Sequence, residues 1–263
     1  MLTKKAKLMG ASIHLAVDHP QAEEVLTEAI NKLQQFERRF SANDPRSELS
    51  YLNQHAHRKM IKVHPQLFKL IEIGLDHSLE EDSYLNIAVG PLVQLWRIGF
   101  QNAQVPKDEE IEEILPLINP KNIILDKHQG SLGFKFANMA IDLGALAKGY
   151  AADLLKEYLQ KSGAQAGLID LGGNILTFGP NPNRQNGRWN IGLQDPKSKR
   201  GEHFAIVKTF NQSVVTSGVY VRQLEYQGKK YHHIFDSQTG YPIETDVSSL
   251  TIISKLSVDG EIW

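Results

Sequence analysis

The chain has 263 residues, of which 41 % are hydrophobic and 22 % charged, as is ordinary for a soluble globular protein. Its net charge of −1 gives no electrostatic case for nucleic-acid binding, and the lysines at positions 4, 5 and 7 form too short a cluster to change that. The absence of cysteine excludes disulfides, thiol catalysis and thiolate metal sites. No stretch approaches the roughly 20 apolar residues that span a bilayer, so we expect no transmembrane segment.

The N-terminus carries basic residues without the apolar stretch of a signal peptide. We therefore expect a cytoplasmic protein, and the alternative is an exported form whose leader has been trimmed. The length suits one large domain or two small ones, and no linker-like segment separates independent parts. A single domain over residues 1–263 is the expectation.

Helical periodicity dominates the first half of the chain. Residues 12–17 predict a strand, and Pro20 suits the start of a helix that apolar residues at helical spacing continue to Phe40. Residues 41–47 predict a loop. Further elements are expected as helices over 65–81 and 109–117 and as a hairpin of strands 122–125 and 131–136.

A helix over residues 146–161 precedes a half that is mostly β. The predicted strands are 167–170, 175–178, 189–193, 205–210, 219–226, 232–235 and 248–254. Early helices followed by many strands favour an α+β fold over regular βαβ alternation. We expect helices mostly in the first half, packed on a largely antiparallel sheet.

Two Asp-Leu-Gly turns, at 142–144 and 170–172, flank the predicted helix and are the most informative feature of the chain. Glycine permits positive φ and close approach to the backbone, and a helix N-terminus attracts anions. Lys148 lies in the first helical turn, where the macrodipole disfavours a cation, so a bound anion explains it better than helix stability. The alternative is an ordinary strand-to-helix turn with a solvated lysine.

Three further groups could carry chemistry. His232 and His233 are candidate proton carriers or phosphate donors, but adjacent strand residues face opposite ways, so only one would face a given site; a structural histidine is the alternative. Residues 215–220 place hydroxyl groups and a glycine at the start of a strand, which suits contacts to a phosphate or a ring. The alternative is an ordinary turn. Asp259, if it is not merely solvated, would suit Mg²⁺ together with backbone carbonyls.

Seven motifs in chain order resemble the FAD:protein FMN transferases, also called ApbE-type flavin transferases. Each motif is weak alone, but their shared order makes chance agreement implausible. They are Met9-Gly10-Ala11, the Phe-Ser…Ser-Glu-Leu…Asn segment 40–53, the run 85–96, the central motif 142–151, Asp-Leu-Gly-Gly-Asn at 170–174, Thr-Ser-Gly at 216–218, and the segment 233–240.

The resemblance implies an enzyme that binds FAD as substrate, cleaves its pyrophosphate with Mg²⁺, and transfers FMN to a Thr or Ser hydroxyl of a target flavoprotein, releasing AMP. Protein flavinylation is the expected function. The residues implied to bind FAD are Met9, Asn43, Tyr84, Leu85, Asn86, Asp142, Lys148, Thr216, Ser217, Gly218, His233 and Ile234.

The resemblance also implies a metal site and catalytic groups. The carbonyl of Ala145 and the carboxylate of Asp259 would hold Mg²⁺, and Lys148 would meet the phosphates or the flavin. His233 would position or deprotonate the attacking hydroxyl. The expected catalytic residues are therefore His233 and Asp259.

Three departures from the family pattern stand out. Asn86 replaces the usual Asp, and Ala11 replaces Thr. The family has Ser or Asp and then Thr at the offsets that Ile262 and Trp263 occupy here, and its usual C-terminal continuation is missing. We therefore expect a flavin transferase domain without that continuation, and Mg²⁺ affinity is the expectation most exposed to the change.

Two other readings stay open. An FAD pyrophosphatase would differ only in using water as the attacking group, giving FMN and AMP. A non-catalytic FAD-binding or flavin-delivery protein would need no complete metal shell, and the residues after Asp259 favour it more than any other feature.

Overall fold

The computed structural model describes residues 1–199, 201–220 and 222–262, and the contacts within it divide the chain into two compact units. The first unit comprises Met1–Glu37, Leu146–Gly218 and Ser249–Trp263. The second comprises Arg38–Ala145 and Val219–Ser248. Among the described residues, no helix is both long and apolar enough to cross a membrane.

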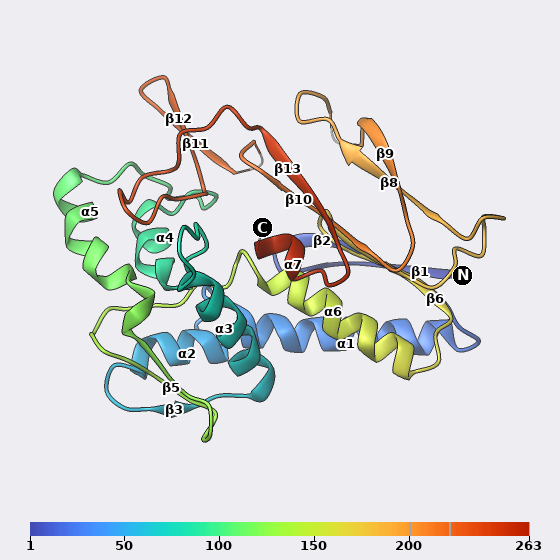
Figure 1. The fold of residues 1–263 in the computed structure, drawn as a ribbon, viewed down its shortest axis with the longest axis horizontal. Coiled ribbons are helices and arrows are strands. Elements are labelled where there is room, and N and C mark those ends of the chain that lie inside the picture. The colour runs from blue at the N-terminus through green and yellow to red at the C-terminus, as the bar shows by residue number, and fades with distance from the viewer. Residues whose placement is uncertain (200, 221, 263) are drawn as a thin grey trace. The chain divides into compact units, whose positions relative to one another are not determined.

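A six-stranded sheet forms the centre of the first unit (Figure 1). Its neighbouring strands all pair antiparallel, which confirms the expected largely antiparallel sheet. In spatial order the strands are β1 (Leu2–Leu8), β2 (Ala11–Asp18), β6 (Ala166–Leu171), β7 (Asn174–Phe178), β10 (Ser213–Gly218) and β13 (Ser249–Ser254).

Two long helices, α1 (Ala22–Phe40) and α6 (Ala147–Lys161), lie on the same side of this sheet (Figure 1). They are neighbours, because the Lys32 ammonium lies 4.7 Å from the centre of the Tyr158 ring. Every second residue of β2 is fully buried, namely Ile13, Leu15 and Val17. This period of two places one face of the sheet in the core, as a half-buried strand requires.

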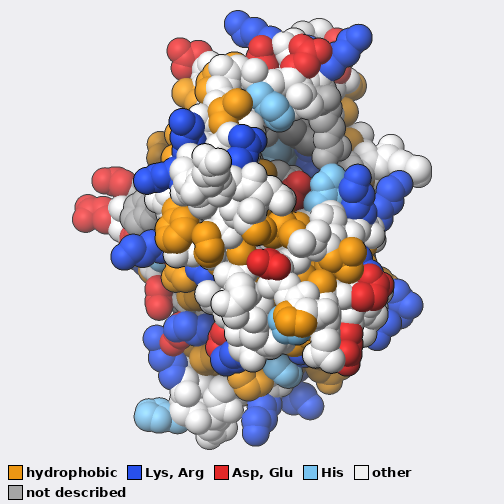
Figure 2. All heavy atoms as spheres, turned by 90° about the vertical axis from the view of Figure 1, so that its right-hand side faces the viewer, with side chains coloured by type: hydrophobic (Ala, Val, Ile, Leu, Met, Phe, Trp, Pro, Cys, Tyr) orange, Lys and Arg blue, Asp and Glu red, His pale blue; other side chains and the backbone are white. Residues whose placement is uncertain are grey.

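Smaller elements complete the first unit. The hairpin of β8 (Trp189–Gln194) and β9 (His203–Thr209) packs Trp189 into a cluster with Val214. Helix α7 (Asp259–Ile262) contacts α6, β10 and β13. Figure 2 shows hydrophobic, acidic and basic side chains interspersed on one face of the molecule.

The second unit is built mainly from short helices. They are α2 (Glu48–His55), α3 (Pro65–Ser78), α4 (Gly90–Trp96), α5 (Asp108–Ile114) and the 3₁₀ helices η1 (Ile87–Val89), η2 (Leu115–Ile118) and η3 (Pro120–Asn122). Its strands are β3 (Ile61–Lys62), β4 (Ile123–Asp126), β5 (Ser131–Phe134), β11 (Gln223–Tyr226) and β12 (Lys229–His232). Trp96 is fully buried at the centre, and its indole N–H donates to the Gly240 carbonyl at 3.0 Å.

The structure confirms the α+β class and corrects several elements. The sequence pattern does not predict strand β1, because its closely spaced lysines indicate only a short charge cluster. Residues 215–218 of the predicted strand entry are instead the end of β10, which lies between β7 and β13 in the sheet, and residues 219 and 220 form a turn. Hydroxyl and glycine residues resemble a turn in sequence, but cross-strand pairing decides the conformation here.

The predicted strands 219–226 and 232–235 are also shifted. Strand β11 begins only at Gln223, and β12 ends at His232, so His233 does not lie on a regular strand. Phe235 makes only an isolated bridge to Pro242, because the chain turns back between them. The expectation that alternation on a strand separates His232 from His233 is therefore wrong.

Candidate functional site

The residues expected to form the site divide between the two units. Those in the first unit are Met9, Lys148, Thr216, Ser217, Gly218 and Asp259. Those in the second unit are Asn43, Tyr84, Leu85, Asn86, Asp142, Ala145, His233 and Ile234. Trp263, which occupies one of the offsets after Asp259, lies outside the described residues.

Lys148 lies in the first turn of α6, as predicted, and has an acidic partner. Its ammonium is 3.4 Å from Glu261 Oε1, and the side chains of Lys148 and Glu261 are 29 % and 6 % exposed. The positive charge at this unfavourable helix end is therefore compensated by a carboxylate of the protein itself. Sequence reasoning missed Glu261, because the two residues are far apart in the chain.

Asp259 is the first residue of α7 and is half-buried. The segment just before it is held by Asp153 of α6, whose Oδ1 and Oδ2 accept the backbone N–H groups of Ser257 at 2.8 Å and Val258 at 2.9 Å. Burial raises the pKa of Asp153 to about 6, and the two N–H donors offset this only in part. Asp153 lies four residues after Gly149 on the same helix face, but this spacing does not predict its bonds to Ser257 and Val258.

A buried polar network ties the same segment to the sheet. Asn174 Nδ2 donates to Glu261 Oε1 at 2.8 Å, and the Ser257 hydroxyl donates to Asn174 Oδ1 at 2.5 Å. The Ser213 hydroxyl donates to Ser257 Oγ at 2.9 Å. Because buried polar groups are costly unless bonded, this network fixes the segment as well as stabilising it.

The second Asp-Leu-Gly motif forms a tight hairpin between β6 and β7. Gly172 and Gly173 have φ values of 74° and 98°, and the Gly173 N–H donates to Asp170 Oδ1 at 2.8 Å. A two-residue turn of this kind needs positive φ at both central residues. The turn alone therefore accounts for these two glycines. The motif contacts the candidate site through Asn174, which donates to Glu261.

Met9 lies in a similar turn between β1 and β2. Its φ is 52°, which is unusual for a residue other than glycine, and that of Gly10 is 69°. The Met9 N–H donates to Glu37 Oε1 of α1 at 2.6 Å, which holds the turn in place. At the other end of the sheet, Thr216 bonds the Thr251 hydroxyl of β13 at 2.9 Å.

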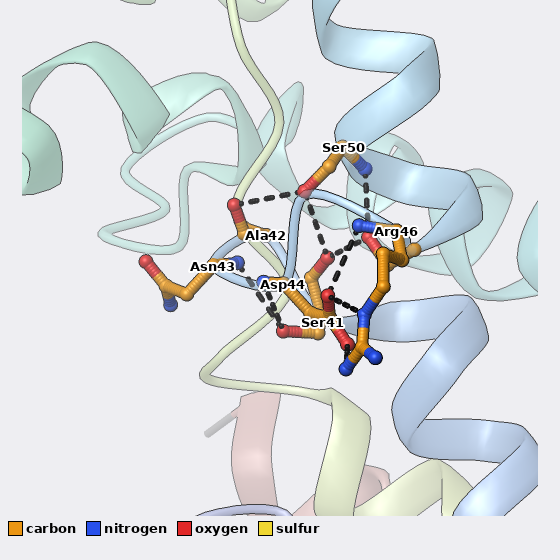
Figure 3. Close-up of polar contacts among 7 residues, drawn as sticks. Ser41, Ala42, Asn43, Asp44, Arg46 and Ser50 are labelled. Carbon is orange, nitrogen blue, oxygen red and sulfur yellow. Dashed lines mark hydrogen bonds and ion pairs between the residues drawn. The ribbon is translucent and has the colours of Figure 1, made fainter.

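Asn43 lies in a loop that its own polar side chains hold together (Figure 3). The Ser41 hydroxyl accepts the N–H groups of Asn43 at 3.2 Å and Asp44 at 3.1 Å, and Ser47 caps α2 by accepting the Ser50 N–H at 2.9 Å. The Asn43 side chain points away from these groups in Figure 3 and accepts a bond from Gln94 Nε2 at 3.3 Å.

The stretch at Tyr84, Leu85 and Asn86 precedes η1. Tyr84 is 78 % exposed. Asn86 accepts the Ala88 N–H at 2.9 Å, and its Nδ2 donates to the Ile118 carbonyl at 2.8 Å and to Ser237 Oγ at 3.1 Å. The amide N–H groups that distinguish Asn from the usual Asp at this position therefore donate to other groups of the protein itself.

Asp142 turns the chain toward Gly144. Its N–H donates to the Ile87 carbonyl at 2.9 Å, and its Oδ1 accepts the Gly144 N–H at 2.7 Å. Burial raises the pKa of the Asp142 carboxyl, against the Gly144 N–H and the Arg222 guanidinium, which lower it. Asn53 pairs with both backbone groups of Ile141 and holds the approach to this turn.

His233 is half-buried and has its Nδ1 3.4 Å from the Arg222 carbonyl oxygen. A carbonyl can only accept, so this contact requires the hydrogen on Nδ1, and the lone pair of a neutral ring then lies on Nε2. Ile234 is anchored by its backbone, since its carbonyl accepts the Ile243 N–H at 3.0 Å. The neighbouring His232 has a pKa lowered by burial.

The expected metal donors fit Mg²⁺ in their chemistry. Ala145 is exposed, and among the described residues no hydrogen bond to its carbonyl is recorded, so that oxygen can serve a cation. Asp259 adds a carboxylate. The described residues contain no group of three His, Asp or Glu side chains placed to hold a metal. A sparse oxygen set suits Mg²⁺, which keeps waters and binds with substrate phosphates.

Comparison with known proteins identifies the family. The model of the ApbE family matches residues 9–263. The FAD:protein FMN transferase of Klebsiella pneumoniae is 37 % identical over 258 residues, covering 98 % of this chain and 79 % of that protein. The FAD:protein FMN transferase of Treponema pallidum is 35 % identical over 268 residues, covering 97 % of this chain and 71 % of that protein.

Solved structures agree. The ApbE protein from Thermotoga maritima has a TM-score of 0.89 at 28 % identity, and the match covers 99 % of this chain and 84 % of that one. The flavin transferase ApbE from Vibrio cholerae has a TM-score of 0.84 at 26 % identity, with the same coverage of 99 % and 84 %. On these matches, the chain belongs to the ApbE family.

Proposed function

We propose that this protein is a Mg²⁺-dependent FAD:protein FMN transferase that links FMN to a Thr or Ser hydroxyl of an acceptor flavoprotein. The observation that carries the proposal is the match to the ApbE family over residues 9–263, with relatives of that named activity. Of the twelve FAD-binding residues proposed from the resemblance, five lie in the first unit and seven in the second.

The proposed reaction exchanges a phosphoanhydride bond for a phosphoester bond. The acceptor hydroxyl oxygen attacks the phosphorus on the FMN side of the FAD pyrophosphate. The bond from that phosphorus to the bridging oxygen breaks, and AMP leaves with that oxygen. The hydroxyl proton is removed, and the product is a phosphoester between FMN and the acceptor.

The chain would hold the metal through the Ala145 carbonyl and the Asp259 carboxylate. Bound Mg²⁺ supplies positive charge that neutralises phosphate oxygens as charge develops on them. Lys148 would add a cation toward the phosphates, with its charge moderated by Glu261 at 3.4 Å.

His233 is the proposed group that orients or deprotonates the attacking hydroxyl. The contact between Nδ1 and the Arg222 carbonyl holds the ring and leaves Nε2 as the basic atom. Substitution of His233 by Ala should lower turnover at saturating FAD by about 10²- to 10⁴-fold, the range of general-base catalysis. Unchanged turnover in H233A would remove His233 from the mechanism.

Two alternatives to the transferase remain. One uses a different attacking group, and the other binds FAD without catalysing a reaction. An FAD pyrophosphatase would use water and yield free FMN and AMP. A non-catalytic flavin binder is favoured by Ile262, which carries no side-chain oxygen at an offset where the family supplies one.

The test is AMP release from FAD with Mg²⁺, with and without a peptide bearing Asp-Gly-x-Thr/Ser-Gly-Ala-Thr/Ser, followed by chromatography. If the protein is a transferase, AMP should form only when the peptide is present, in an amount equal to that of the flavin bound to the peptide. AMP with free FMN, whether or not peptide is present, supports the hydrolase. FAD binding without AMP supports the binder.

A further inference from the structure

One face of α6 lies directly against the chain segment 257–261, which carries Asp259. Gly149 makes this approach possible. A Cβ added to Gly149 would lie 2.7 Å from the Ser257 carbonyl oxygen and 2.8 Å from the Val258 Cα. Glu261 Cγ would lie 2.8 Å away as well. Real Cβ contacts are not this short, and two of these three obstacles are backbone atoms, so any larger residue must push the segment away.

Asp153 holds the same segment one helical turn further along α6. Its two carboxylate oxygens each accept one backbone N–H, from Ser257 at 2.8 Å and from Val258 at 2.9 Å. Two bonds from one carboxylate to successive amides fix both the position and the orientation of the peptide that leads into Asp259. Charge-assisted bonds of this kind are among the stronger ones in proteins.

The opposite side of the segment is equally confined. A Cβ on Gly260 would lie 2.7 Å from Val215 Cγ2, so α7 packs tightly on β10. Val258 and Gly260 are both buried, whereas Asp259 between them is half-buried. The residues beside Asp259 are therefore packed in place, while Asp259 itself stays partly accessible.

We infer that Asp153 is a positioning residue for the metal ligand Asp259, and that Gly149 provides the space this requires. The inference rests on the proposed function, because it takes Asp259 as a Mg²⁺ ligand. A ligand that is fixed in advance loses less conformational freedom when the ion binds. Groups that orient a metal ligand typically contribute about 10–100-fold in metal affinity.

The test uses the full chain with Mn²⁺ alone as the metal probe. Mn²⁺ affinity is measured by electron paramagnetic resonance of the free ion, and backbone order in residues 255–262 by hydrogen exchange. The variants are Asp153→Asn, Asp153→Ala, Gly149→Ala and Asp259→Ala. Leu159→Ala is the control, since Leu159 is fully buried on the same helix but has no recorded bond to the segment.

We expect faster exchange at Ser257 and Val258 in D153N, and faster still in D153A, because Asn keeps one acceptor oxygen and Ala keeps none. Mn²⁺ affinity should fall about tenfold or more in D153A. G149A, which displaces the segment from a different point, should weaken Mn²⁺ binding as well. L159A should lower the melting temperature without changing either measurement at this segment.

Three results would overturn the inference, and they separate its failure from that of the proposed function. Unchanged hydrogen exchange at residues 257–258 in D153N and D153A would show that the carboxylate of Asp153 does not hold this segment. Faster exchange with unchanged Mn²⁺ affinity, while D259A binds Mn²⁺ more weakly, refutes the positioning role alone. Unchanged Mn²⁺ affinity in D259A refutes the ligand role of Asp259, and the positioning role falls with that part of the proposed function.

Discussion

Lys148 and Glu261 form an ion pair 3.4 Å long between the first turn of α6 and the short helix α7. The Glu261 side chain also accepts a bond from Asn174, so its carboxylate is fixed beside the lysine. A residue that the sequence presents as a free cation is thus partly neutralised in the folded chain. Binding of phosphate at Lys148 would compete with this carboxylate.

Replacing Glu261 by Gln should therefore tighten FAD binding. Gln keeps an oxygen for Asn174 but removes the negative charge, and we expect about three- to tenfold higher affinity, or roughly 1 kcal/mol. Isothermal titration with FAD measures the change. Glu157→Gln is the matched control, because Glu157 pairs with Lys161 on the exposed side of the same helix. Equal or weaker FAD binding in E261Q would contradict the expectation.

Restoring the usual family residue at position 86 should destabilise this chain. In Asn86→Asp a carboxylate oxygen would replace the amide that donates to the Ile118 carbonyl and to Ser237. Two acceptors would then face each other, and we expect the free energy of unfolding to fall by about 1–3 kcal/mol. Urea denaturation measures this, with the exposed Asn183→Asp as control. A loss no larger than that of N183D would show that these bonds contribute nothing.

The buried carboxyl of Asp142 should make stability depend on pH. Its folded-state pKa is raised by burial above the ordinary value of 3.8, so the fold favours the protonated form. The resulting contribution is present below the unfolded pKa and is lost as the pH rises through the folded pKa. Relative to Asp142→Asn, which keeps an acceptor for Gly144, the wild type should lose stability as the pH rises above the ordinary aspartate value of 3.8. Urea denaturation at a series of pH values measures the difference, and a wild type that gains stability instead would refute it.

Tyr241 should titrate unusually late. Its hydroxyl donates to Asp108, which raises the pKa of Tyr241 to about 12. The contribution of this bond is complete below about pH 10 and is lost as the pH rises through about 12. Tyr241→Phe should remove one late phenol from the ultraviolet titration and lower stability near neutral pH by about 1 kcal/mol.

The control for this prediction is Tyr226→Phe, which removes an exposed phenol from a hairpin. Its loss should leave the late phase intact. If Y241F retains the late phase, the assignment to Tyr241 is wrong.

Much of the fold follows from local sequence patterns. Periodic apolar residues located α1 and α6, and alternation located β2, because each pattern matches the geometry of a single element. Strands β1 and β10 escaped prediction, since lysines and a Thr-Ser-Gly run take extended structure here only through their neighbours in the sheet. The short helices α2 and α4 carry too few turns for periodicity to mark them.

In the candidate site, too, some residues could be predicted from the sequence, whereas others depend on contacts between distant segments. The resemblance named Lys148 and Asp259. Glu261, which pairs with Lys148, and Asp153, which holds the segment just before Asp259, are found only from contacts between segments about a hundred residues apart. Nothing in local spacing predicts such pairs. The use of Asn86 as a donor was likewise visible only once Ile118 and Ser237 had been placed beside it.

The proposed product is an acceptor that carries FMN through a phosphoester bond. The most direct measurement is the intact mass of the acceptor peptide after incubation with this protein, FAD and Mg²⁺, alongside a peptide whose acceptor Thr is replaced by Ala. We predict that the Thr peptide gains the mass of FMN less one water, with one AMP released for each flavin bound, and that the Ala peptide gains nothing. An unmodified Thr peptide, with or without AMP in solution, would contradict the transferase assignment.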